Sequence, residues 1–107
     1  MEFEHMLEVR PNCECCDKDL APDSTEAMIC TYECTFCETC VNDILENVCP
    51  NCGGGFAFRP IRPKVARRTG LSISHQPASV ERVYTKYTIE ELKEFSARVK
   101  HLKPEDR

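Results

Sequence analysis

Nine of the 107 residues are cysteine, and all nine lie between residues 13 and 52. Eight of them form four pairs in which two or three residues separate the members: Cys13 and Cys16, Cys30 and Cys34, Cys37 and Cys40, Cys49 and Cys52. A C-x2-C pair turns the backbone tightly and presents two thiolates to one ion, so eight sulfurs can form two tetrahedral four-sulfur sites. The cysteines therefore predict a small metal-stabilised α+β module.

Zinc is the metal that we expect, as two Zn²⁺ ions per chain. The chain has only eight aromatic residues and no tryptophan, so it offers little apolar core. Structural zinc sites contribute about 10–16 kcal/mol each in zinc-finger peptides, which is enough to hold such a module together. An iron–sulfur protein, a disulfide scaffold and a redox-active cysteine pair are the alternatives.

The acidic start of the chain does not resemble a secretory signal, and no apolar run of about 18 residues predicts a membrane span. We therefore expect a cytoplasmic protein, in which cysteines bind metal rather than form disulfides.

Two pairings of the eight thiols are possible. Sequential pairing, as in LIM domains, would place the first four cysteines of the series on one ion and the last four on the other. Cross-brace pairing, as in RING domains, would alternate the pairs between the two ions. The spacer between Cys40 and Cys49 holds apolar residues at helical spacing, namely Val41, Ile44, Leu45 and Val48, and its length is that of RING modules. We therefore predict Cys13, Cys16, Cys37 and Cys40 as the first set of metal ligands, and Cys30, Cys34, Cys49 and Cys52 as the second.

Four other residues have side chains that bind metals. Cys15 lies inside the first pair and is expected to be a bystander at the tip of its turn, with an alternative ligand or reactive thiol as the second interpretation. The three histidines are not at ligand spacing and are expected on the surface: His5, His75 and His101.

Charge divides the chain into two halves. Residues 1–58 contain 12 acidic and 2 basic residues, a net charge of −10, whereas residues 59–107 contain 12 basic and 6 acidic residues, a net charge of +6. Five cations follow the module without an acid between them: Arg59, Arg62, Lys64, Arg67 and Arg68. They could contact nucleic acid, but the acidic module next to them would compete with phosphate. We therefore expect this cluster to neutralise the module, and we do not expect nucleic-acid binding.

A second folded segment is predicted near the C-terminus. Thr88 and Glu91 form a capping box, and an apolar stripe of Ile89, Leu92, Phe95, Val99 and Leu102 predicts an amphipathic helix over about 89–102. Phe56–Phe58 is a candidate strand, and residues 63–80 have the composition of a linker with little reason to order. The predicted organisation is a two-zinc module at 6–60, a basic linker at 61–86 and a helical segment at 87–104.

The stretch from Met6 to about Pro63 resembles domain-of-unknown-function family 1272, a bacterial cysteine-rich family. The residues that carry the resemblance are LEVRPNCECCDKDLAPDSTEAMICTYECTFCETCV, followed by VCPNCGGGF and RPIRP. The resemblance implies a zinc-binding, RING-like or treble-clef fold and indicates no particular activity.

We predict a zinc-binding interaction or adaptor module rather than an enzyme, because ions held by four thiolates have no open position for water. The stripe of Leu92, Phe95 and Val99 is the expected contact with a protein partner or a second copy, with no membrane partner. A ubiquitin-ligase-like activity, with a conjugating enzyme near Pro50, is disfavoured. Glu14 and Cys15 stand where such ligases usually have an apolar residue, and Gly53 stands where a basic residue is common.

Overall fold

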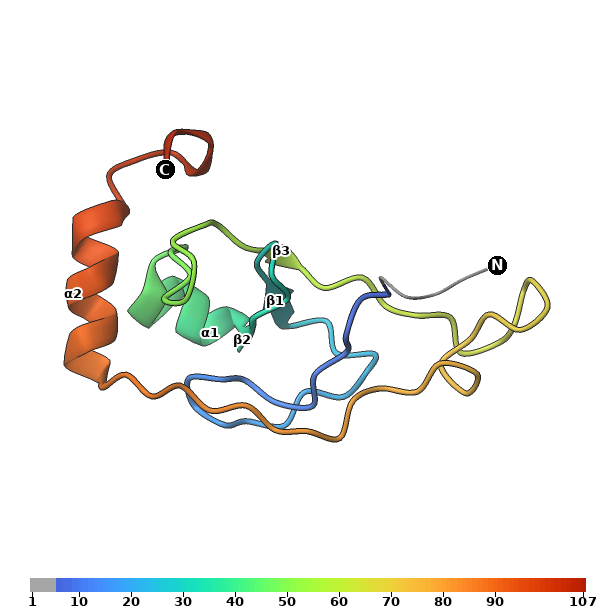
Figure 1. Cartoon of the computed structure of the whole chain (residues 1–107). Helices are drawn as coiled ribbons and strands as arrows, with labels where there is room; N and C mark the ends of the chain where they lie inside the picture. The colour runs from blue at the N-terminus through green and yellow to red at the C-terminus, as the bar shows by residue number, and fades with distance from the viewer. Residues whose placement is uncertain (1–5) are drawn as a thin grey trace.

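The computed structural model describes residues 6–107, so the surface position expected for His5 lies outside the described residues. The molecule is elongated, with extents of 46 × 28 × 21 Å. Figure 1 shows helix α2 at one end and the loop of residues 60–77 at the other, with the cysteine-rich module between them. The fold combines short strands and helices, as expected of a small α+β protein.

Three short strands form an antiparallel sheet in the order β2-β1-β3. Strand β1 (Ala27–Ile29) lies in the centre, β2 (Thr35–Cys37) on one side and β3 (Ala57–Phe58) on the other. Met28 is paired with Phe36 of β2 and with Phe58 of β3. The strand candidate at residues 56–58 is therefore an edge strand of this sheet, and it closes the module after the last cysteine.

The helical spacer lies directly after β2. Helix α1 (Glu38–Cys40) continues into the π-helical turn η1 (Val41–Leu45), which ends where Glu46 and Asn47 adopt positive φ angles. The helical segment thus begins before Val41, where it was predicted to start. It ends before Val48, because Glu46 and Asn47 have a left-handed backbone conformation. Its apolar side is nevertheless buried, and it forms the core together with β1 and β2 around Phe36, which packs edge-on against Phe56 at 5.4 Å.

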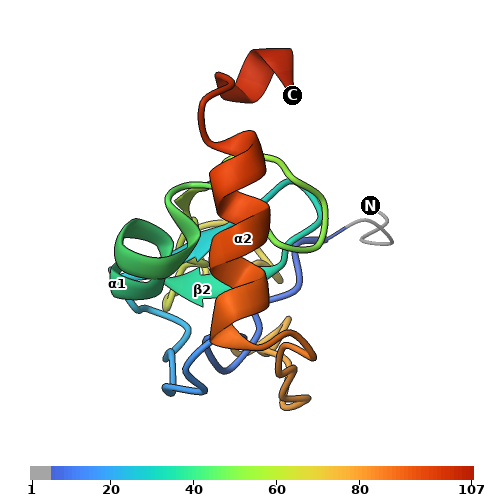
Figure 2. The ribbon, with the colours of Figure 1, turned by 90° about the vertical axis from the view of Figure 1, so that its left-hand side faces the viewer.

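Helix α2 (Ile89–Val99) packs across the helical turn η1, as Figure 2 shows. Both bonds of the predicted capping box are present between Thr88 and Glu91. The helix ends three residues before the predicted position, because the chain turns after Val99 and enters the short helix η2 (Pro104–Asp106). Within residues 6–107, no helix has the length and apolar character needed to cross a lipid bilayer.

The apolar stripe of α2 is covered only at its centre. Leu92 is 1% exposed and belongs to the core of the module, whereas Ile89 and Leu102 at the two ends are 42% and 39% exposed. Ser96, also buried, donates a hydrogen bond of 2.8 Å to the carbonyl oxygen of Leu45 in η1. Leu92 and the hydrogen bond of Ser96 therefore attach the helix to the module, and an ion pair of 3.0 Å between Lys100 and Glu46 adds a contact at the end of the helix.

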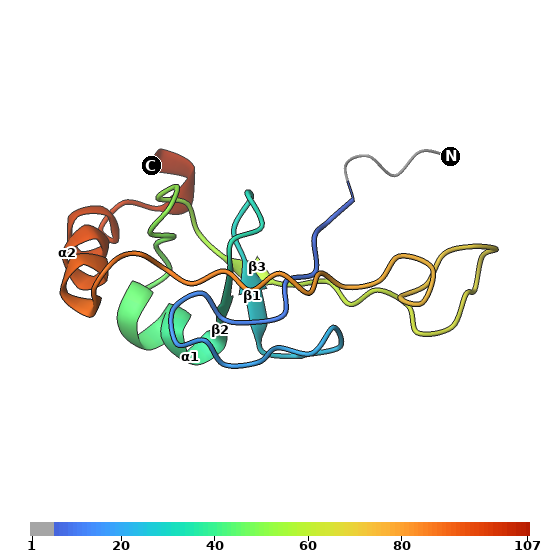
Figure 3. The same ribbon diagram turned by 60° about the horizontal axis from the view of Figure 1, so that its bottom comes forward.

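The segment expected to be a linker is folded back onto the module. Residues 60–77 form a loop, and a hydrogen bond from Ile73 N to Pro63 O joins its outgoing and returning strands of chain. Residues 79–85 then run back beside the N-terminal segment, as Figure 3 shows, and bond to it through Ser79 N to Val9 O and Thr85 N to Glu14 O. We call residues 79–85 the strap, because they lie across the first cysteine pair.

Candidate metal centre

Four cysteines from two separate segments form the first thiol group. Cys13 and Cys16 lie in a turn of the N-terminal segment, Cys37 ends β2 and Cys40 ends α1. The four Sγ atoms all lie within 4.8 Å of one another, and those of Cys16 and Cys37 are 3.9 Å apart. A tetrahedral zinc site with bonds of about 2.3 Å separates its sulfurs by about 3.8 Å, so this group fits such an ion.

The second thiol group is less complete. The Sγ atoms of Cys30, Cys34 and Cys49 lie within 4.8 Å of one another, and all three side chains are buried. Cys52, the predicted fourth ligand, is exposed and lies outside this group. It is still close by, because Cys34 and Cys52 line the same open hollow together with Tyr32 and Asn51.

The two groups take their members alternately from the sequence. The first uses the pairs at 13/16 and 37/40, and the second uses the pair at 30/34 and Cys49. The antiparallel pairing of β1 and β2 explains this order, since Cys30 and Cys34 occupy the turn at one end of the hairpin, whereas Cys37 lies opposite Ala27 at the other end. The grouping follows the cross-brace order and not the sequential one.

Backbone N–H groups point at several of the sulfurs. Tyr32 N lies 3.3 Å from Cys30 Sγ, and Gly54 N lies 3.4 Å from Cys52 Sγ. The N–H groups of Cys15 and Cys16 interact in the same way with Cys13 and favour its thiolate. Because a thiolate is the form that binds a metal, these turns suit metal ligation.

Three of the buried thiols favour their protonated form. A hydrogen bond with Cys40, together with burial, raises the pKa of Cys13 to about 12. Burial likewise raises the pKa of Cys49 and of Cys34. These thiols are therefore protonated near pH 7 until a metal ion displaces the protons.

Cys15 lies outside both thiol groups, as expected of a bystander, but it is not on the surface. Its side chain is only 5% exposed and belongs to the buried core of the module. A hydrogen bond with Cys40 lowers the pKa of the Cys15 thiol, although its sulfur lies outside the group of four. The other non-ligand candidates, His75 and His101, are exposed, as expected.

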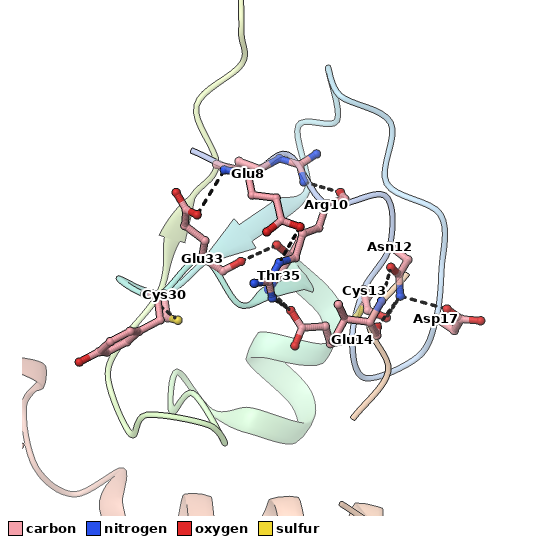
Figure 4. A network of polar contacts seen from close by, with 12 residues as sticks. Glu8, Arg10, Asn12, Cys13, Glu14, Asp17, Cys30, Glu33 and Thr35 are labelled. Atoms are coloured by element: carbon pink, nitrogen blue, oxygen red, sulfur yellow. Dashed lines mark hydrogen bonds and ion pairs between the residues drawn. The ribbon is translucent and has the colours of Figure 1, made fainter. Parts of the chain in front are cut away.

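The buried carboxylate of Glu14 joins the first cysteine pair to the sheet. Its Oε2 atom accepts hydrogen bonds from Thr35 N at 2.6 Å and from Arg10 Nη1 at 2.9 Å, as Figure 4 shows. The backbone of Glu14 also bonds to Thr35, from Glu14 N to Thr35 O. Since Thr35 is two residues before Cys37, this network fixes two cysteine-bearing segments relative to each other. Sequence reasoning missed it, because it treated Glu14 only as a departure from the apolar pattern.

The strap adds a second set of contacts behind the same cysteine pair. Asn12 is fully buried, and its Nδ2 atom donates to Val83 O at 2.8 Å and to Asp17 Oδ1 at 3.0 Å. Arg82 pairs with Asp17 at 3.0 Å and with Asp19 at 2.7 Å. The two carboxylates that pair with the strap thus lie one and three residues after Cys16, and their partner Arg82 is outside the predicted basic cluster.

Two members of the basic cluster are used inside the fold. Arg59 is 4% exposed and donates to the carbonyl oxygens of Arg10 and Ala21 at 2.8 and 3.0 Å. Arg62 bonds in the same way to the carbonyl oxygens of Leu7 and Gln76. Lys64, Arg67 and Arg68 are exposed and form no ion pair with any residue between 6 and 107. The cluster therefore joins segments more than it neutralises acids.

Comparison with known proteins places the sequence in a family. The family model described as "Protein of unknown function (DUF1272)" matches residues 6–62, so the predicted resemblance is confirmed. Uncharacterized protein R02474 of Rhizobium meliloti (strain 1021) is 54% identical over 78 residues, which cover 73% of this chain and 86% of that protein. No solved structure matches the chain significantly. The family match ends at residue 62, so most of the loop, the whole strap and α2 lie beyond it.

Proposed function

Since the chain belongs to the DUF1272 family of proteins of unknown function, we propose from its own residues that it is a RING-like zinc-binding interaction module. In this proposal two Zn²⁺ ions are structural, and the protein acts in the cytoplasm by binding a protein partner rather than by catalysis. The observation that supports it most strongly is the pair of alternating thiol groups, each assembled from segments far apart in the chain.

The local structure around the thiols supports a RING-like arrangement. A hairpin carries members of both groups, and a helical turn lies between Cys40 and Cys49, in the position where RING modules have their short helix. All eight proposed ligands are thiolates, which favour zinc over metals that prefer oxygen ligands, such as magnesium. Four thiolates complete a tetrahedral shell, so no position remains for a metal-bound water, and a structural role follows.

Two other functions receive less support. The face near Pro50, where a ubiquitin-conjugating enzyme would dock, is occupied by α2: Pro50 is buried and shares a hollow with Leu92 and Phe95. For nucleic-acid binding, Arg59 and Arg62 are engaged with backbone carbonyl groups, which leaves three exposed cations in the cluster. Leu92 is likewise unavailable to a partner, so a contact through α2 would use Phe95 and Val99, which are half-buried.

The experiment that tests the proposal is native mass spectrometry of the purified full chain, combined with elemental analysis. We expect two zinc ions per chain in the wild type and in Cys15→Ser, whose sulfur lies outside both groups. Cys37→Ser should lose at least one ion and much of the folded circular-dichroism signal, because zinc binding and folding are coupled. Iron in place of zinc, or one ion in the wild type, would overturn the proposal.

A further inference from the structure

The two thiol groups differ in how closely their sulfur atoms lie together. In the first group all four sulfurs are already within 4.8 Å of one another. In the second, three buried sulfurs are assembled and the fourth proposed ligand, Cys52, is outside the group. An ion at the second position would therefore depend on a ligand that has to move toward it.

Access from solvent also differs around the exposed thiol of each group. Cys52 lies at the edge of an open hollow of about 460 Å³, and the buried ligand Cys34 lines the same hollow. An incoming molecule at this position could reach both sulfurs. Cys16 is the exposed member of the first group, but it is followed by Asp17, which is held by Asn12 and by Arg82 of the strap.

The two turns have the same pattern of backbone hydrogen bonds, at 2.7 and 2.8 Å around Cys52 and at 2.8 Å around Cys16, but the turn of Cys16 is also held by the side chains of Asn12 and Arg82. Cys52 precedes three consecutive glycines, and Gly53 has a φ of +79°, a conformation that residues with a side chain rarely adopt. Gly54 N donates to the sulfur of Cys52, and the carbonyl oxygen of Gly53 accepts only a long bond of 3.4 Å from Arg107. The turn that carries Cys52 can therefore change conformation at lower cost than the strapped turn that carries Cys16.

From these differences we propose that the second ion is exchangeable and that Cys52 is the ligand that leaves. This inference rests on the proposed function, since it requires zinc at both groups. The acceptor would be a thiolate ligand, whose sulfur binds the ion from the open hollow while the bond between Cys52 and the ion breaks. The Cys52 thiolate then takes a proton from solvent, and the remaining three cysteines release the ion in later steps. The first ion stays bound and keeps the module folded.

Zinc release from the fully loaded full-length chain, measured with the chromophoric chelator 4-(2-pyridylazo)resorcinol, tests this proposal. We expect two phases of one ion each, with the faster at least about ten times faster than the slower. Cys52→Ser should abolish the fast phase and retain the slow one. Its matched control, Cys16→Ser, changes the exposed thiol of the other group and should instead affect the slow phase. A single phase for both ions, or a loss of the slow phase in Cys52→Ser, would overturn the proposal.

A second measurement needs no variant and therefore avoids the risk that a substitution prevents folding. The zinc-loaded wild type is treated with a limiting amount of N-ethylmaleimide, and the modified cysteine is identified by peptide mass mapping. We expect Cys52 to react first and one zinc ion to be lost with it, whereas first reaction at Cys16 would overturn the proposal. Wild-type protein that binds fewer than two zinc ions would overturn the proposed function itself, whereas two ions released equally would overturn only this inference.

Discussion

Replacement of Glu14 by alanine should destabilise the module, because the carboxylate is buried and hydrogen-bonded. The change removes one carboxylate oxygen that accepts two hydrogen bonds, from the backbone of Thr35 and from the guanidinium of Arg10. Hydrogen bonds that involve a charged group contribute about 1.5–3 kcal/mol each. Thr35 is fully buried, so its N–H loses its partner in Glu14→Ala, whereas Arg10 is partly exposed and regains some hydration. We therefore expect the free energy of unfolding to fall by about 3 kcal/mol.

Urea unfolding of the zinc-loaded protein, followed by circular dichroism at one fixed free zinc concentration, measures this loss. The zinc concentration must be fixed because a ligand that binds only the folded state adds to its stability. Glu14→Gln keeps an acceptor for Thr35 and removes the charge, so it should lose less than Glu14→Ala. Asp43→Ala, which removes an exposed acid of the same module, should change the free energy by about 0.5 kcal/mol or less. If Glu14→Ala behaves like Asp43→Ala, the proposed role of this network is refuted.

Three further predictions concern the helix, the strap and pH. Leu92→Ala should lower the free energy of unfolding by about 2–5 kcal/mol in the same assay, because the side chain is 1% exposed in the core; a loss below 1 kcal/mol would contradict its packing against the module. Arg82→Ala should increase backbone hydrogen exchange in residues 12–19 and leave α2 unchanged; unchanged exchange in both regions would show that the strap does not restrain the first cysteine pair. Zinc binding at pH 7 should release about four protons per ion, because thiols must lose their protons to bind a metal and burial raises the pKa of Cys34 and Cys49, so zinc affinity should fall as pH falls. Calorimetry in two buffers of different ionisation enthalpy counts these protons, and a release near zero would contradict the thiol assignment.

The local features of the fold could be predicted from the sequence because their signals are local. The capping box of Thr88 and Glu91 depends on two residues three positions apart, and both of its bonds are present. The spacing of the cysteine pairs indicated two metal sites in a small α+β protein. The burial of Leu92 followed from the helical period, because an apolar stripe on one face needs a surface to cover it, either the module or a second copy.

The contacts that fix the segments relative to one another could not be predicted in this way. Asn12 bonds to Val83, which is 71 residues further along the chain, and Arg59 bonds to Arg10 and Ala21 through carbonyl groups that every residue possesses. Such partners depend on the path of the chain and carry no signature in residue type. For the same reason, composition predicted a linker at 63–80 with little reason to order. In the structure, Ile73 N bonds to Pro63 O across the loop, and Ser79 N bonds to Val9 O of the N-terminal segment.

X-ray absorption spectroscopy at the zinc edge of the purified full chain tests the central claim most directly, because it reports the identity and number of the atoms bound to the metal. The two alternating thiol groups, with Cys52 completing the second, predict an average of four sulfur ligands per zinc at about 2.3 Å. In Cys52→Ser the remaining zinc should keep this all-sulfur shell, because the first group does not include that residue. Nitrogen or oxygen ligands at about 2.0–2.1 Å in the wild type would contradict the account.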